Sequence, residues 1–306
     1  MSNDLRKKSA KAKELLEFAK SKSESGDFAY KLAARSFESH LDELSQIELT
    51  SQTTSAFEIL DFRIIAPNLK TGSAPLDLIS KLSKEIRKTL GYAALRLTQG
   101  GIGRKRIPKR LHGELDLRLQ GLLPGSSRFI ISANSNRDLF DYGLSKGAIE
   151  RMFAVLTSMG HGEDFLTSVN ILGPSGAKSL REFLKVIKSY SAEAEFTWKY
   201  LGDDISRWDG TKEAIDSVTS ALEVTEIMEQ EKIVLHGKVE LLSKREKIEL
   251  RVSEGNLLKI LYPKSKLPVV SELHLEQEVT LYCQVTETEN PLTNESSIFY
   301  ELLEVR

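Results

Sequence analysis

A run of positive charge without any acid is the most distinctive chemical feature of the sequence. Residues 99–113, which we name the basic segment, contain Arg104, Lys105, Arg106, Lys109 and Arg110 and no Asp or Glu. Glycines at 100, 101 and 103 and a proline at 108 predict an exposed loop rather than a helix or strand. Such a loop can follow phosphates, which supply most of the sequence-independent affinity for nucleic acid. We therefore expect these five residues to bind nucleic acid or another anion; an acidic protein partner and a merely solvated loop are the alternatives.

A second set of side chains has the chemistry to hold a divalent cation. Asp203 and Asp204 follow a glycine, and Asp209 is close behind them. Carboxylates are the ligands that Mg²⁺ uses at phosphoryl-transfer sites. They define the alternative function, a metal-dependent phosphoesterase or nuclease whose substrate the basic segment would hold. The same acids are also typical of a turn that caps the helix expected after Thr211, which needs no metal.

The remaining motifs predict no catalysis. Residues 173–179, with the sequence Gly-Pro-Ser-Gly-Ala-Lys-Ser, lack the spacing of a phosphate-binding P-loop and indicate a Gly-Pro turn with Ser175 as helix N-cap. Cys283 lies on the apolar phase of an expected strand and indicates a small core residue. No two histidines have a metal-ligand spacing; they are His40, His112, His161, His236 and His274. We therefore expect a non-catalytic protein without metal or cofactor.

Composition indicates an ordinary globular protein of several modules. The 306 residues carry 43 Lys+Arg against 44 Asp+Glu, a net charge of -1, and 40% are hydrophobic. No apolar run approaches the length that crosses a bilayer, and residues 1–24 are polar without the apolar core of an export signal. The single cysteine excludes an internal disulfide framework. These features predict a cytoplasmic protein that does not enter a membrane.

Three consecutive modules are expected to position these side chains. Over residues 1–50, two apolar stripes at helical spacing, separated by a polar break at 23–26, predict a helical hairpin. Its apolar face must be buried, so we expect a protein partner or self-association there. A linker over 45–55, rich in Ser, Thr and Gln, separates it from the next module.

The central module, residues 55–225, reads as a mixed α+β domain. A strand over 57–65, a helix over 75–97, a hairpin over 114–133, helices over 144–159 and 175–190, a strand near 196–200 and a last helix after 211 follow in order. A hairpin in the middle of mixed elements favours α+β over a doubly wound parallel sheet.

The C-terminal module, residues 230–306, shows five short segments with period-2 alternation and predicts a small five-stranded β-barrel of OB or SH3-like type. From Glu231 to Arg306 it carries ten Lys/Arg and thirteen Asp/Glu. That negative balance favours contact with protein, or packing against the rest of the chain, over nucleic-acid binding by the barrel. The sequence as a whole therefore predicts a binding or accessory protein, a subunit of a protein or protein–nucleic acid complex.

Overall fold

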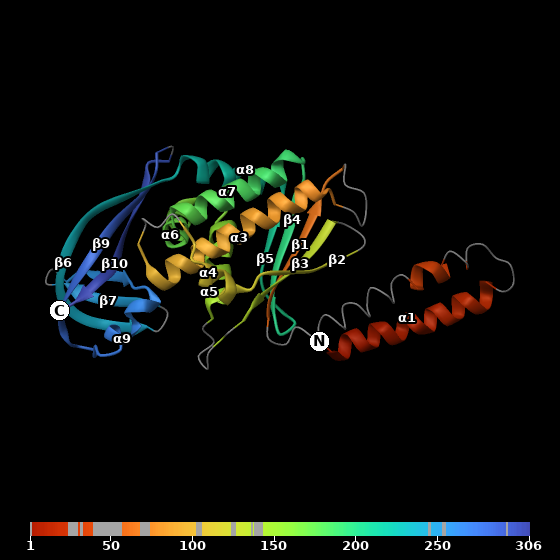
Figure 1. Cartoon of the computed structure of the whole chain (residues 1–306), viewed down its shortest axis with the longest axis horizontal. Helices are drawn as coiled ribbons and strands as arrows, with labels where there is room; N and C mark the ends of the chain where they lie inside the picture. The colour runs from red at the N-terminus through yellow and green to blue at the C-terminus, as the bar shows by residue number, and fades with distance from the viewer. Residues whose placement is uncertain are drawn as a thin grey trace.

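The computed structural model describes residues 2–23, 30, 33–38, 57–67, 74–101, 106–123, 127–135, 137, 143–243, 246–252, 255–291 and 293–306. It confirms the α+β class: helices accompany two separate β-sheets, each with its own hydrophobic core (Figure 1). No helix among these residues is long and apolar enough to cross a membrane.

The central sheet has five strands in the order β2-β3-β1-β4-β5, and each neighbouring pair is antiparallel. The strands are β1 Phe57–Ile65, β2 Arg118–Leu123, β3 Ser127–Asn134, β4 Glu193–Tyr200 and β5 Asp203–Gly210. Leu60, Phe62 and Ile64 of the middle strand alternate into the core because successive side chains of a strand point to opposite faces. The Phe62 ring stacks on Phe196 with 4.2 Å between ring centroids.

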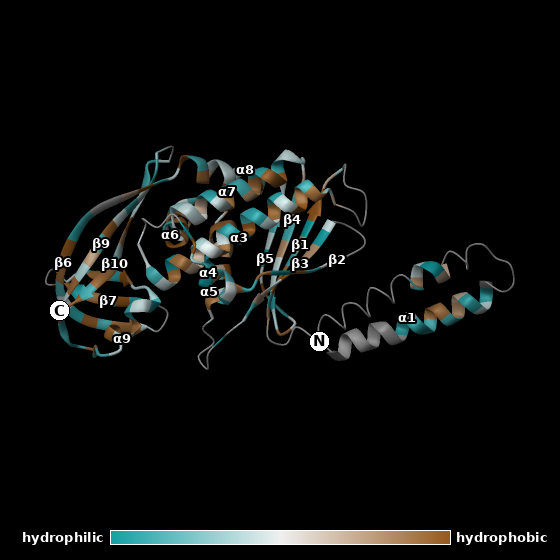
Figure 2. Ribbon diagram, viewed as in Figure 1, coloured by the Kyte–Doolittle hydropathy of each residue, from teal (hydrophilic) through white to brown (hydrophobic). Residues whose placement is uncertain are grey.

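Helices pack against the apolar face of this sheet. They are α3 Leu76–Gln99, α4 Lys109–Leu115, α5 Leu144–Thr157, α7 Pro174–Ser189 and α8 Lys212–Val224. Helix α6 Gly162–Leu172 packs instead on α5, on α7 and on the second sheet. Hydrophobic residues recur along the strands and along α3 and α7 (Figure 2), and the long helix α3 buries Leu82, Ile86 and Leu90. The opposite face of the sheet is charged: Arg63 pairs with Glu195 at 3.3 Å. This face therefore carries solvent-accessible ion pairs, while the other face builds the core.

The second sheet is a closed barrel in the order β10-β8-β7-β6-β9. Its strands are β6 Glu226–Ser243, β7 Lys247–Val252, β8 Leu257–Leu261, β9 Glu278–Asn290 and β10 Glu295–Val305, with the short helices η1 Lys264–Lys266 and α9 Leu267–Val270 between β8 and β9. Strand β8 runs parallel to β10, and the other neighbours are antiparallel. The period-2 alternation of the sequence thus places Val239, Leu250 and Leu281 in a common core.

Four elements differ from the sequence prediction. The second half of the basic segment is helix α4 rather than loop, because Leu111 and Leu115 are buried and hold one helical face in place. The predicted hairpin exists, but β2 begins at Arg118 rather than at 114, since α4 occupies the preceding residues. Helix α6 and strand β5 were not predicted at all.

The structure describes only part of the helical hairpin predicted over residues 1–50. Helix α1 spans Ser2–Ser23. Phe18 meets Tyr30 with 6.1 Å between ring centroids, and Lys20 pairs with Glu38 at 2.7 Å. Most of the second predicted helix and the 45–55 linker lie outside the described residues. The helical hairpin therefore stays a prediction, as do the domain boundaries at 1–50, 55–225 and 230–306.

Candidate nucleic-acid interface

The structure describes three of the five residues predicted to contact phosphate. Arg106, Lys109 and Arg110 are exposed, whereas Arg104 and Lys105 lie outside the described residues. Lys109 and Arg110 occupy the first turn of α4, and Arg106 stands just before Pro108, the residue that precedes this helix. The cations are therefore presented by a short helix and by the chain that leads into it.

A glycine on α3 allows α4 and the chain before it to pack closely. A Cβ atom at Gly91 would lie 2.7 Å from Ile107 Cδ1 and 3.6 Å from His112 Cε1. Because glycine has no Cβ, the Ile107 side chain can approach the α3 backbone at this point. Ile107 and the buried face of α4 thus fix the direction in which the neighbouring cations point.

Packing of α4 on α3 brings a cation from outside the basic segment close to it. The pKa of His112 is lowered, chiefly because the ring is partly buried and also because the positive charge of Arg87 on α3 is nearby. Arg87 is exposed. We name Arg87, Arg106, Lys109 and Arg110 the α3–α4 basic surface.

The charges of this surface are largely unneutralised. Arg110 Nε lies 2.6 Å from Glu114 Oε1 in the same helix. Within the described part of the chain, Arg87, Arg106 and Lys109 have no carboxylate partner. Unpaired exposed cations carry only water and loosely held counterions, so they can exchange these for phosphate oxygens.

The acidic residues of the alternative function do not converge. Asp203 and Asp204 open strand β5, and Asp209 lies near its end. Asp209 lies five positions after Asp204 along the strand, a distance of about 16 Å. Two of the three acids are also paired with cations: Asp204 lies 3.5 Å from Lys199 and Asp209 2.8 Å from Arg207. Across the described ranges, no three His, Cys, Asp or Glu side chains gather in a way that could hold a metal ion.

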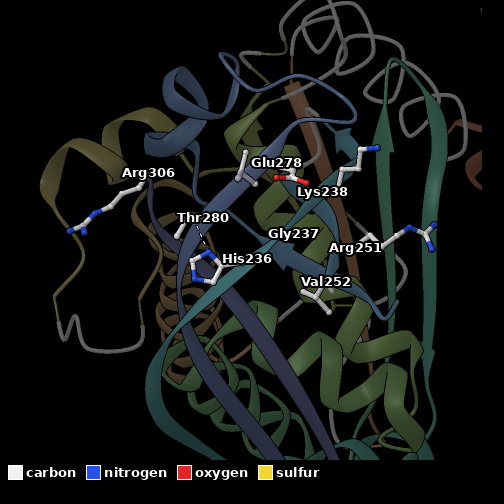
Figure 3. Close-up of a pocket in the computed structure, with 9 residues that line it drawn as sticks. His236, Gly237, Lys238, Arg251, Val252, Glu278, Thr280 and Arg306 are labelled. Carbon is white, nitrogen blue, oxygen red and sulfur yellow. Dashed lines mark hydrogen bonds between the residues drawn. The ribbon is translucent and has the colours of Figure 1, made fainter. Parts of the chain in front are cut away.

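The barrel carries a wide groove of about 600 Å³, which Figure 3 shows. Its lining residues include His236, Gly237, Lys238, Arg251, Glu278, Thr280 and Arg306. Each of its three permanent cations already has a carboxylate: Lys238–Glu276 at 2.5 Å, Arg251–Glu240 at 2.5 Å and Arg306–Glu304 at 3.3 Å. The side chains of Arg251 and Arg306 extend to opposite sides of the groove (Figure 3). With Glu278 added, carboxylates outnumber these cations, so the groove attracts anions less than the α3–α4 basic surface does.

The other predicted motifs take structural positions. Gly173, at φ 81°, is the N-cap of α7 and Pro174 its first residue, so the Gly-Pro turn is present but Ser175 is not the cap. Cys283 is fully buried in the barrel core, and this burial raises the pKa of its thiol to about 12. Comparison of the chain with protein-family models, with curated proteins and with solved structures finds no match.

Proposed function

We propose that this chain is a non-catalytic, cytoplasmic nucleic-acid-binding accessory protein that contacts the phosphate backbone through its basic segment. The observation that carries the proposal is the gathering of unpaired cations on the α3–α4 basic surface, where the fold adds Arg87 to Arg106 and Lys109. Arg104 and Lys105 belong to the same segment by sequence. Because point charges on phosphates carry no base information, the binding is sequence-tolerant and falls steeply with salt.

The barrel has a different part in this proposal. Its strand order, the parallel β8–β10 pair and the helices between β8 and β9 support an OB-type barrel rather than an SH3-like one. The paired cations of its groove and its excess of acids argue against a strong phosphate site of its own. We assign it to contact with protein or with the rest of this chain.

The N-terminal helices supply the proposed protein contact. Leu15 and Phe18 of α1 are 40% and 53% exposed, which leaves apolar surface for a partner or a second copy of the chain. Light scattering of the full chain and of a chain that starts at residue 50 tests self-association. Identical monomeric masses for both would remove it.

The test of the proposed function is titration of labelled duplex DNA and single-stranded RNA at about 50 mM and 200 mM salt. The variant changes Arg104, Lys105, Arg106, Lys109 and Arg110 to Ala. The matched control changes the same number of exposed cations elsewhere to Ala: Lys188, Arg207, Lys212, Lys232 and Lys259. Both variants lose five positive charges, so a nonspecific effect of net charge weakens them equally.

We expect the basic-segment variant to bind roughly a hundredfold more weakly at the lower salt, because about five phosphate contacts are lost. We expect the control to stay within about threefold of wild type, as distant charges are screened beyond ~10 Å. Equal affinities of the two variants would overturn the proposal. Binding of an acidic protein, but not of DNA or RNA, would assign the segment to a protein contact.

A further inference from the structure

A single carboxylate of the barrel holds the start of the basic segment. Glu301 lies on β10 and is 9% exposed. Its Oε1 accepts a hydrogen bond from the backbone N–H of Gly101 at 2.7 Å. Its Oε2 lies 2.7 Å from Nη1 of Arg96, on the last turn of α3. The second contact is an ion pair rather than an aligned hydrogen bond, since Nη1 has no hydrogen-bond partner among the described residues.

The backbone at the end of α3 fits around this carboxylate. Gly100 has φ +63°, and a Cβ there would lie 1.9 Å from Glu301 Oε1 and 3.1 Å from Pro263 Cγ. Its N–H closes the helix by donating to the Arg96 carbonyl at 3.0 Å. Only glycine combines this conformation with so close an approach. The chain therefore leaves α3 in one direction, set by Glu301.

Neighbouring contacts hold the barrel, and Glu301 with it, against the helices. Arg151 of α5 reaches Glu246 of the barrel at 3.3 Å, and Asn170 of α6 donates to Thr288 of β9 at 2.9 Å. Burial lowers the pKa of Arg151 to about 10, so this arginine stays charged at neutral pH. The first contact ties the chain between β6 and β7 to α5, and the second ties β9 to α6. The Gly101 hydrogen bond lies in the same partly buried junction. A hydrogen bond from an N–H to a charged acceptor is worth more there than in water.

We propose that Glu301 is a positioning residue for nucleic-acid binding: it anchors the N-terminal end of the basic segment, as α4 anchors the C-terminal end. The inference rests on the proposed function of that segment. A segment fixed at both ends loses less conformational entropy on binding than a segment fixed at one end, so it binds phosphates more tightly. The barrel thereby contributes to affinity without touching the nucleic acid.

Two double variants separate the anchor from the ion pair. Both double variants carry Arg96→Met, because an arginine left buried without its Glu301 carboxylate would destabilise the protein for another reason. Glu301→Gln keeps an acceptor for the Gly101 N–H, whereas Glu301→Met has similar length and no acceptor. Affinity for duplex DNA and hydrogen–deuterium exchange of the peptide over residues 98–108 are measured for both, with thermal unfolding as the measure of the whole fold.

We expect the Gln variant to bind within about twofold of wild type and the Met variant roughly fivefold more weakly, the effect of one hydrogen bond. The Met variant should also exchange faster over residues 98–108, at a melting temperature close to that of the Gln variant. Equal affinity and equal exchange in the two variants would overturn the inference while the proposed function stands. If wild type binds no nucleic acid, the proposed function fails, and the exchange alone decides whether Glu301 anchors the segment.

If the Met variant does not fold, Glu301→Asp replaces it, because this carboxylate is one methylene too short to reach both Arg96 and Gly101. Faster exchange over residues 98–108 in Glu301→Asp supports the anchor. Wild-type exchange there would overturn it.

Discussion

Glu58 of β1 is fully buried, and the stability of the central sheet should depend on its charge. Arg137 donates two hydrogen bonds to its carboxylate, from Nε at 2.6 Å and from Nη2 at 2.8 Å. The indole N–H of Trp198 donates to the same carboxylate at 2.8 Å, and the Ser135 hydroxyl donates to it at 3.2 Å. Arg137 also stacks on Tyr200, with 3.3 Å between guanidinium carbon and ring centroid. The negative charge is thus surrounded by donors and has no access to water.

Glu58→Gln tests this cluster because it keeps the shape and removes the charge. The Arg137 guanidinium, only 8% exposed, is then left without a counter-charge. Breaking one partner of a buried pair typically destabilises a protein by about 3–5 kcal/mol, and we expect a loss of about 3 kcal/mol at pH 7. In Glu58→Gln combined with Arg137→Met no charge remains buried, while the Gln oxygen still accepts from Trp198. We expect that double variant to recover at least about 1 kcal/mol of the loss.

Urea unfolding followed by tryptophan fluorescence measures the effect directly. The chain has two tryptophans, Trp198 and Trp208, and both lie on the central sheet, so the signal reports on that part of the molecule. A loss below about 1 kcal/mol for Glu58→Gln, or a double variant less stable than the single one, would refute the reasoning.

Further predictions follow from single positions. Cys283, with its pKa raised to about 12, should resist thiol reagents in the folded protein at pH 8 and react only on unfolding; rapid native labelling, followed by mass spectrometry, would contradict its buried position. Arg87→Gln should raise the pKa of His112 in an NMR titration, but only in part, because burial is the larger cause of its lowering. Phosphate beside this imidazole should raise the same pKa, so DNA binding takes up a proton and strengthens as the pH falls through the range in which His112 titrates; a pH-independent affinity would place the DNA elsewhere. Gly100→Ala should lower stability by about 3 kcal/mol, because it combines backbone strain with displacement of a buried carboxylate. The control Gly101→Ala, which has no atom within 4 Å of its new Cβ, should lose only about 1–2 kcal/mol in the same thermal unfolding measurement.

Elements with a regular apolar period could be predicted from the sequence. The barrel strands and the middle strand β1 are present where alternation indicated them, because each buries one face against a core. Strand β5 escaped prediction because it is an edge strand with charged residues such as Asp203 and Arg207 at exposed positions. Helix α4 escaped because Pro108 and Gly113 are typical of loops, whereas tertiary burial of two leucines decides its structure.

The candidate site could be predicted only as far as its charges are neighbours in sequence. The cluster from Arg104 to Arg110 is visible in one stretch of chain. Arg87 joins it only because α4 folds back on α3, and Glu301 meets Gly101 across 200 residues of sequence. Contacts of this kind follow from tertiary packing, which a single sequence without aligned relatives does not reveal.

The salt dependence of duplex DNA binding tests the central claim most directly. Five phosphate contacts from the basic segment predict a slope of roughly -4 to -5 in a plot of log affinity against log salt concentration. If the α3–α4 basic surface acts as a unit, Arg87 makes a sixth contact and steepens the slope by about one, so Arg87→Ala should return it to the five-contact value. A wild-type slope near zero, or the same slope after all five cations of the basic segment are changed to Ala, would contradict phosphate binding by this segment.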